Sequence, residues 1–194
     1  LKMRLGWDDA TKNAPELARR AQDEGVQLVT VHGRTRQQFY KGRADWSAIR
    51  AVREAISIPL IANGDCESVL DARAMLAASG ADGVMIGRAA LGRPWLIGEI
   101  AHGLDPDQVS APSLQARGEA AREHLETLTE LMGEHAGLRH ARKHLAAYVD
   151  HIGGQHPARA ADRNRLVTTD DLAEAKTLLA SFFAADEDVS TSRN

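Results

Sequence analysis

The chain has 194 residues, 43% of them hydrophobic, which is enough for one domain or somewhat more, with a sizeable core. Its formal net charge of −3 excludes a global field that attracts nucleic acid, so any such site must be a local patch. A single cysteine excludes an internal disulfide and favours a reducing cytoplasm. No apolar run approaches the ~20 residues of a membrane span, and no signal-peptide pattern opens the sequence.

Four short apolar runs, each ending near a glycine or a polar turn, predict four consecutive βα units of an α/β fold. We expect the strands at 1–6, 28–31, 60–62 and 83–86. The intervening helices are expected from a cap at Asp8 or Asp9 to about 24, at 46–55 and at 68–78. Because the strands are apolar throughout rather than alternating, they indicate a parallel sheet buried on both faces.

Four βα units amount to half of an eight-stranded (β/α)8 TIM barrel. The sequence opens without Met and already within a strand pattern, so we expect a fragment of a longer protein. Four parallel strands cannot close, which would leave two edges and an apolar inner face exposed. Two copies are therefore expected to associate as a homo-oligomer through these half-barrel edges.

Beyond residue 103 the strand pattern stops and helical periodicity takes over. We expect a half barrel at 1–103, a small all-α domain at 104–185 and a disordered tail at 186–194. Gly153-Gly154 is expected to end one helix, and Thr168 or Thr169 to cap another at 170–183. Three apolar stripes should face the helical core: Ala121, Leu125, Leu128 and Met132; Leu138, Ala141, Leu145, Tyr148, Val149 and Ile152; and Leu172, Ala175, Leu179 and Phe182.

The turns Asn63-Gly64-Asp65 and Gly87-Arg88 follow neighbouring strands of the predicted sheet. They should lie side by side at its carboxyl edge, where backbone N–H groups and helix N-termini can bind a phosphate. Arg88 adds a fixed positive fork. The alternative is a pair of tight strand-to-helix connections.

Lys2 and His32 are further candidates at the mouth of the barrel. If Lys2 points inward, its ammonium needs an anionic or carbonyl partner; otherwise it is a strand end in solvent. His32 ends the second strand, where barrel enzymes place working groups, although a histidine there is often structural. The loop that follows carries Arg34 and Arg36 among Phe39, Tyr40 and Trp46, a mixture that suits phosphate contact and base stacking or simply a solvated loop.

A second basic patch lies in the helical part. Residues 138–165 contain six Lys or Arg and two Asp, and Arg139 and Lys143 fall opposite the apolar stripe. The pattern suits a polyanion surface or a solvated helix face. His140 and His144 have the spacing of metal ligands, but without a third ligand or an HExxH pattern we expect no metal.

Cys66 stands near the start of a predicted helix. That position favours a thiolate, but an isolated cysteine packing as a small hydrophobe is the commoner case and the one expected here.

Several segments, in order and spacing, resemble tRNA-dihydrouridine synthases, and the bacterial DusB branch fits best. They cover the chain to about residue 183: 2–7 (KMRLGW), 32–36 (HGRTR) with 40–42 (YKG) and 44–46 (ADW), 58–65 (IPLIANGD), 87–95 (GRAALGRPW) and 142–144 (RKH). The resemblance implies the carboxyl-terminal half of an FMN-containing barrel, followed by a helical tRNA-binding domain. The implied reaction reduces the C5–C6 bond of a uridine in tRNA, with NADPH as the reductant of the flavin. The amino-terminal half of the barrel would then be a missing partner.

The resemblance also implies roles for particular residues. Lys2 would contact the flavin's pyrimidine edge, and His32 would lie beside the ring. The phosphate would be bound by Asn63, Gly64, Asp65, Gly87 and Arg88. The residues that would contact tRNA are Arg34, Arg36, Arg139, Arg142 and Lys143. The family's proton donor is a cysteine in the amino-terminal half of the barrel, and Cys66 lies where the family usually has an aliphatic residue. No catalytic residue is therefore expected here, and the chain alone should not reduce uridine.

Two other functions remain open. Another FMN barrel could act on a small molecule, although such a substrate needs no basic helical surface. A non-catalytic RNA-binding or regulatory module would bind tRNA in a salt-dependent way without flavin.

Overall fold

The computed structural model describes residues 1–104, 112–152 and 157–184, which divide into two compact units. The sheet unit comprises the described residues 1–90 and 96–104, and the helical unit comprises 91–95, 112–152 and 157–184. The segment 91–95 groups with the helices, whereas the sequence placed it in the first domain. The predicted tail at 186–194 and the Gly153-Gly154 helix end lie outside the described residues.

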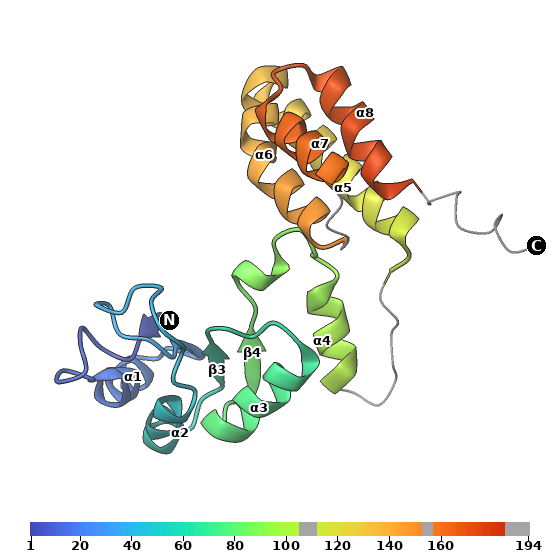
Figure 1. Cartoon of the computed structure of the whole chain (residues 1–194). Coiled ribbons are helices and arrows are strands. Elements are labelled where there is room, and N and C mark those ends of the chain that lie inside the picture. Colours follow the sequence, from blue (N-terminus) through green and yellow to red (C-terminus); the bar gives the residue numbers. More distant parts are fainter. Residues whose placement is uncertain (105–111, 153–156, 185–194) are drawn as a thin grey trace, which may run out of the picture. The chain divides into compact units, whose positions relative to one another are not determined.

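The sheet unit is an α/β fold with four parallel strands in the order β1-β2-β3-β4. Along the chain its elements are β1 (Lys2–Arg4), α1 (Ala14–Asp23), β2 (Val29–His32), η1 (Ser47–Ile49), α2 (Arg50–Ala55), β3 (Leu60–Asn63), α3 (Val69–Ser79), β4 (Gly83–Met85), η2 (Arg88–Ala90) and α4 (Leu96–Leu104). Figure 1 shows their succession in colour. The four predicted strands are all present: β1 is three residues shorter than predicted, β2 is shifted by one, β3 is one residue longer and β4 is one residue shorter.

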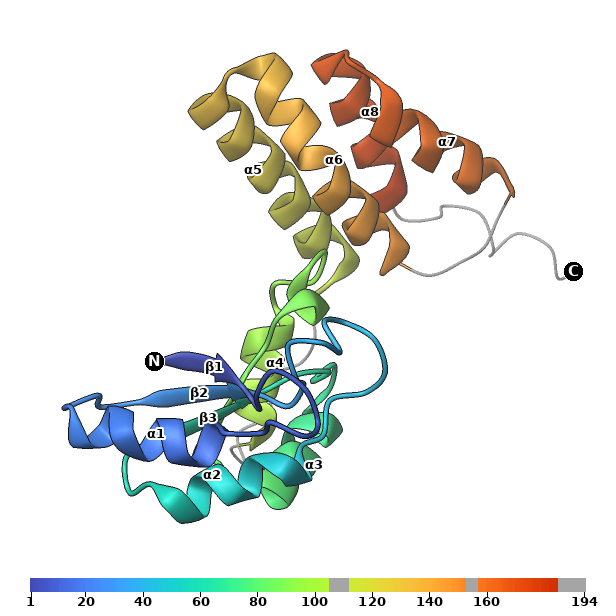
Figure 2. The same ribbon diagram turned by 90° about the vertical axis from the view of Figure 1, so that its left-hand side faces the viewer.

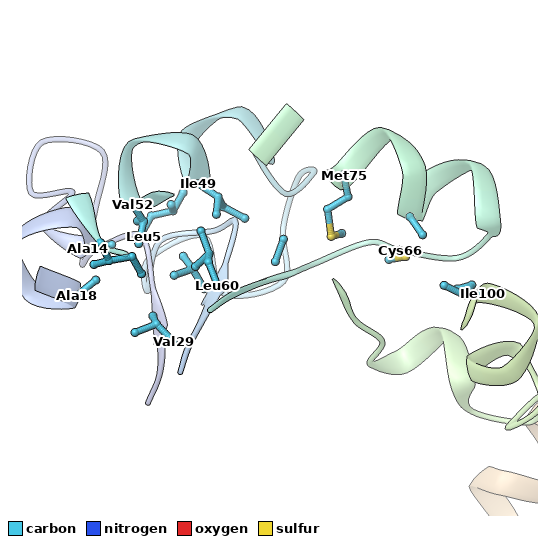
Figure 3. Close-up of a cluster of buried hydrophobic side chains, with 14 of the residues drawn as sticks. Leu5, Ala14, Ala18, Val29, Ile49, Val52, Leu60, Cys66, Met75 and Ile100 are labelled. Atoms are coloured by element: carbon cyan, nitrogen blue, oxygen red, sulfur yellow. The ribbon is translucent and has the colours of Figure 1, made fainter. Parts of the chain in front are cut away.

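The core of the sheet unit lies on one face of the sheet. Val29, Val31, Leu60 and Ala62 are fully buried and form one cluster with α1, α2 and α3. These three helices lie along the same side of the strands in Figure 2, and Figure 3 shows Leu5, Ile49, Val52 and Leu60 within the cluster. In β3, however, Ile61 and Asn63 are only half-buried. The prediction of burial on both faces is confirmed for β2 but wrong for β3, because the alternate side chains face away from the helices, and it is wrong for β1 and β4, where no residue is fully buried.

The sequence placed the first helix too early. Asp8 accepts hydrogen bonds from Thr11 within a turn, and α1 begins at Ala14 after Asn13, whose side chain makes no cap. The predicted helix at 46–55 is split into η1 and α2. The prediction for α3 is confirmed, since Ser68 accepts the Asp71 N–H as an N-cap.

The helical unit consists of α5 (Leu114–Met132), α6 (Glu134–Asp150), α7 (Pro157–Thr168) and α8 (Leu172–Phe183). The predicted stripes form one buried cluster, except that Met132 is 42% exposed. The sequence missed α7, as it missed α4 in the sheet unit. The cap of α8 is Asp171, which accepts from Ala173 and Glu174, and not Thr168 or Thr169. No described helix combines the length and apolar character that a membrane span requires.

Candidate cofactor cavity and basic surface

The strand register places three polar side chains and a methionine in one row across the sheet. Arg4, His32, Asn63 and Met85 are successive partners in the pairings of β1 with β2, β2 with β3 and β3 with β4. Since side chains alternate along a strand, this row faces away from the buried Val31 and Ala62. It lines a cavity of about 300 Å³ at the carboxyl ends of the strands. All seven residues predicted to bind the cofactor line it: Lys2, His32, Asn63, Gly64, Asp65, Gly87 and Arg88.

The turn after β3 is held by contacts on both sides. Asn63 Nδ2 donates to the Met85 carbonyl at 2.8 Å, which ties β3 to β4. Trp46 Nε1 donates to the Gly64 carbonyl at 2.7 Å. Gly64 and Asp65 both have positive φ, at 123° and 55°, so the backbone reverses sharply before α3. The geometry brings the Asp65 carboxylate over the carboxyl edge of the sheet.

The Asp65 carboxylate interacts with three partners. Its Oδ2 accepts from Arg34 Nη2 at 2.6 Å and from the Ala44 N–H at 2.8 Å, and its Oδ1 lies 3.6 Å from Arg88 Nη2. Burial opposes ionisation of this carboxyl. The hydrogen bonds from Ala44 and Arg34 and the charges of Arg34 and Arg88 outweigh it, so the pKa of Asp65 is lowered. Asp65 is thus an anion that lies between two arginines, and its role at a cofactor phosphate stays a prediction.

Arg34 lies inside the protein, with a side chain only 2% exposed. Its Nε donates to the Lys41 carbonyl at 3.3 Å and its Nη2 donates to the Gly42 carbonyl at 2.6 Å. With Asp65 on the same nitrogen, the guanidinium is largely occupied by the protein itself. The Arg34 side chain turns inward and supplies the donors that loop carbonyls and the half-buried Asp65 carboxylate need, and its contact with tRNA stays a prediction.

His32 is 8% exposed and neutral. Burial, together with the positive charges of Arg4, Lys2 and Arg34, lowers its pKa to about 4, and the opposing charge of Asp65 is smaller. A neutral imidazole offers one N–H and one acceptor. His32 is therefore a hydrogen-bonding group at pH 7, not a cation.

Arg88 is an exposed cation of the cavity, with 63% of its side chain accessible. The Tyr40 ring stacks under its guanidinium at 4.9 Å, and Arg4 lies 5.8 Å from the same ring. Tyr40 and Arg4 lie in segments that carry the family resemblance, but the sequence assigned neither of them a role in the site. Arg4 was recognisable from its spacing, since it lies two positions after Lys2 and so on the same strand face.

Cys66 also borders the cavity but is 3% exposed and belongs to the core cluster. Burial, reinforced by Asp71 and Glu67, raises the pKa of its thiol to about 11. The interpretation as a small hydrophobe is confirmed.

The predicted tRNA-contacting residues of α6 differ in exposure. Arg139 and Lys143 are exposed beside an open depression of about 570 Å³. Arg142 instead donates to the Thr168 and Thr169 carbonyls and to Asp170 at 2.6 Å, which ties α6 to the turn between α7 and α8. Contact of Arg142 with tRNA stays a prediction, and within the fold its guanidinium is paired with Asp170. His144 packs on His124 with 4.6 Å between ring centroids, and the described residues contain no cluster of metal-ligand type.

Comparison with known proteins gives one consistent family. The model of the dihydrouridine synthase (Dus) family matches residues 1–185. A probable tRNA-dihydrouridine synthase of Rhizobium leguminosarum bv. phaseoli is 55% identical over 150 residues, which cover 77% of this chain and 45% of that protein. One of Rickettsia conorii is 45% identical over 186 residues, covering 95% and 55%. Probable tRNA-dihydrouridine synthase 1 of Synechocystis sp. is 45% identical over 194 residues, covering 100% and 52%.

The chain spans about half the length of these curated relatives. The match of the family model runs through both the cavity and the helical unit. The chain belongs to the dihydrouridine synthase family.

Proposed function

We propose that this chain forms the FMN phosphate-binding half of a TIM barrel and a tRNA-binding helical domain of a tRNA-dihydrouridine synthase. The reaction is reduction of the C5–C6 bond of uridine in tRNA with NADPH, and FMN, when bound, supplies the hydride. The observation that carries the proposal is the cavity at the carboxyl ends of four parallel strands, where Arg88 is exposed and cationic. Barrel enzymes place their sites at this edge.

The residues present fit a phosphate-bearing cofactor. Arg88 and Lys2 supply positive charge, and both line the cavity. At Gly87 a β-carbon would meet no atom within 4 Å, so the backbone is open to close approach by a ligand. His32 adds a neutral hydrogen-bonding group, and Asn63 holds the two strands that carry the turns together.

Uridine reduction also needs a proton at C5. Cys66 is the chain's single cysteine, and it is buried with its pKa raised to about 11. Its thiol is therefore a poor proton donor to the C5 atom of a uridine outside the core. We therefore propose that residues 1–194 alone do not reduce uridine. Turnover of a tRNA substrate by this chain with FMN and NADPH would overturn that statement.

For tRNA, the exposed cations are the proposed contacts. Arg36 is exposed in the loop after β2, with its guanidinium 5.3 Å from the Phe39 ring, and Arg139 and Lys143 are exposed on α6. Arg34 and Arg142 are assigned instead to holding these elements in place. Strands β1 and β4 form the two edges of the described sheet, where further barrel strands or a second copy of the chain would pair.

The first experiment is an FMN titration of the chain, followed by flavin fluorescence. Saturable binding is expected, and Arg88→Ala should weaken it by roughly tenfold or more, the scale of one charge-assisted hydrogen bond. Arg19→Ala is the matched control, since Arg19 is exposed on α1 and pairs only with Asp23 among the described residues. Absence of binding would show that these four strands alone make no cofactor site. Salt-dependent tRNA binding without FMN binding would favour the RNA-binding module.

A further inference from the structure

The Arg34 guanidinium reaches the histidine of the cavity as well as the loop. Arg34 Nη1 lies 3.3 Å from His32 Nε2, and both side chains are buried. A guanidinium carries only donors, so Nε2 must be the acceptor in this contact. The single proton of a neutral imidazole is then on Nδ1. This contact fixes a tautomer that isolated imidazole side chains do not favour.

The charges around His32 keep the ring neutral. Lys2 and Arg4 of β1 and Arg34 of its own loop are positive, and Asp65 of the turn after β3 is negative. Asp65 itself is paired with Arg34 at 2.6 Å, so it leaves the imidazole facing a net positive surrounding. His32 therefore presents a neutral Nδ1–H donor near pH 7.

A second line of contacts leads from Arg34 to Arg88. Arg34 and the Ala44 N–H both bind Oδ2 of Asp65, which leaves Oδ1 facing Arg88 at 3.6 Å. Arg34 also holds the carbonyls of Lys41 and Gly42, the residues directly after Tyr40. Tyr40 in turn stacks on Arg88 at 4.9 Å. Asp65 and Tyr40, which both contact the exposed Arg88 side chain, are thus both linked to the buried Arg34.

We propose that Arg34 is a positioning residue of this cavity: it fixes His32 as the neutral Nδ1–H tautomer and orients Arg88 through Asp65 and Tyr40. The His32 donor and the Arg88 cation of the cavity are then held at fixed places, which suits a ligand with a carbonyl or ring-nitrogen acceptor at one end and a phosphate at the other. The Arg88 part rests on the proposed function. The His32 part concerns the ligand-free protein and stands independently of it.

Nitrogen-15 NMR of histidine-labelled, ligand-free protein tests the His32 part. The imidazole nitrogens report the tautomer directly. Wild type should show His32 with its proton on Nδ1 and should stay neutral to near pH 4. A proton on Nε2 in wild type would overturn the proposal, and this measurement does not depend on any variant folding.

Arg34→Met should raise the pKa of His32 by roughly one unit, the scale of losing an adjacent charge, and should release the tautomer toward Nε2–H. Arg53→Met is the matched control, because it removes an arginine–aspartate pair of the same unit, Arg53 with Asp82 at 2.9 Å, away from the cavity. The control should leave both His32 properties unchanged. An unchanged tautomer and pKa in folded Arg34→Met would contradict the proposal.

Titration with inorganic phosphate and with FMN tests the Arg88 part in Asp65→Asn. Loss of the carboxylate charge alone would tighten binding of an anion, whereas loss of Arg88 orientation would weaken it. We expect weakening by severalfold, with the His32 tautomer retained. Equal or tighter binding would overturn the Arg88 part. If wild type binds neither ligand, the proposed function and the Arg88 part both fail, while the tautomer result still decides the His32 part.

Discussion

Gly64 lies so close to His32 that a β-carbon on Gly64 would be 2.8 Å from the imidazole Cδ2. The same carbon would lie 2.6 Å from Ala44 Cβ, and Gly64 has φ of 123°. The turn after β3 therefore packs its backbone directly on the histidine ring, and only glycine fits there.

Gly64→Ala should lower the free energy of unfolding by about 2 kcal/mol or more, because it combines a strained backbone with overpacking. Gly87→Ala is the comparison, since its β-carbon would meet no atom within 4 Å. It should change stability by no more than about 0.5 kcal/mol, although it can obstruct a ligand. Urea unfolding followed by tryptophan fluorescence measures both. Equal stability of the two variants would contradict the packing seen around Gly64.

Acid should destabilise the folded chain through His32. Its pKa is about 4 in the fold against 6.5 ordinarily, so between these values the unfolded chain binds a proton that the folded chain does not. The contribution of neutral His32 to the free energy of unfolding is complete above pH 6.5 and is lost as the pH falls through about 4. It amounts to about 3 kcal/mol at most. In His32→Gln, unfolding free energies measured across this range should fall less steeply with acidification than in wild type.

Cys66 should be unreactive in the folded protein. Its side chain is 3% exposed and its pKa is raised to about 11, so little thiolate is present at pH 8 and reagents cannot reach it. A chromogenic disulfide reagent should label the native chain slowly and the urea-unfolded chain at once. Cys66→Ala should retain FMN binding. Fast labelling of the folded chain would restore the thiol as a candidate reactive group.

Substitutions on α6 should affect either stability or RNA binding, depending on whether the residue is paired within the fold, as Arg142 is, or exposed, as Arg139 and Lys143 are. Arg142→Met removes three hydrogen bonds to the turn between α7 and α8 and should destabilise the helical unit by about 1–3 kcal/mol, measured by circular dichroism.

The double variant Arg139→Met with Lys143→Met should leave that unfolding transition in place. It should lower tRNA affinity and reduce the slope of log K against log salt by roughly 1.8, about 0.9 for each of the two lost phosphate contacts. A variant pair with full tRNA affinity would remove α6 from the proposed RNA surface.

Local patterns sufficed for much of the fold. Apolar runs that end in glycine turns marked all four strands, and the Ser68 cap and the stripe from Leu138 to Val149 were recognisable because they depend on neighbours within a few positions. The start of α1 and the existence of α7 were not, since weak caps and polar composition leave helix ends to tertiary packing. The adjacency of the Asn63-Gly64-Asp65 and Gly87-Arg88 turns followed from parallel strand order, and both turns line one cavity.

The sequence by itself determined the family, the parallel βα pattern and which segments carry the polar turns, because these are properties of residue order. Only the tertiary structure decided which arginine of a basic loop is buried. Arg34 and Arg36 are alike in local context, yet Arg34 meets Asp65 from 31 positions away and Arg36 remains exposed. The desolvation cost of burying a charge is offset only where a carboxylate and carbonyl groups pair with it. Those partners come together around Arg34 only in the folded chain.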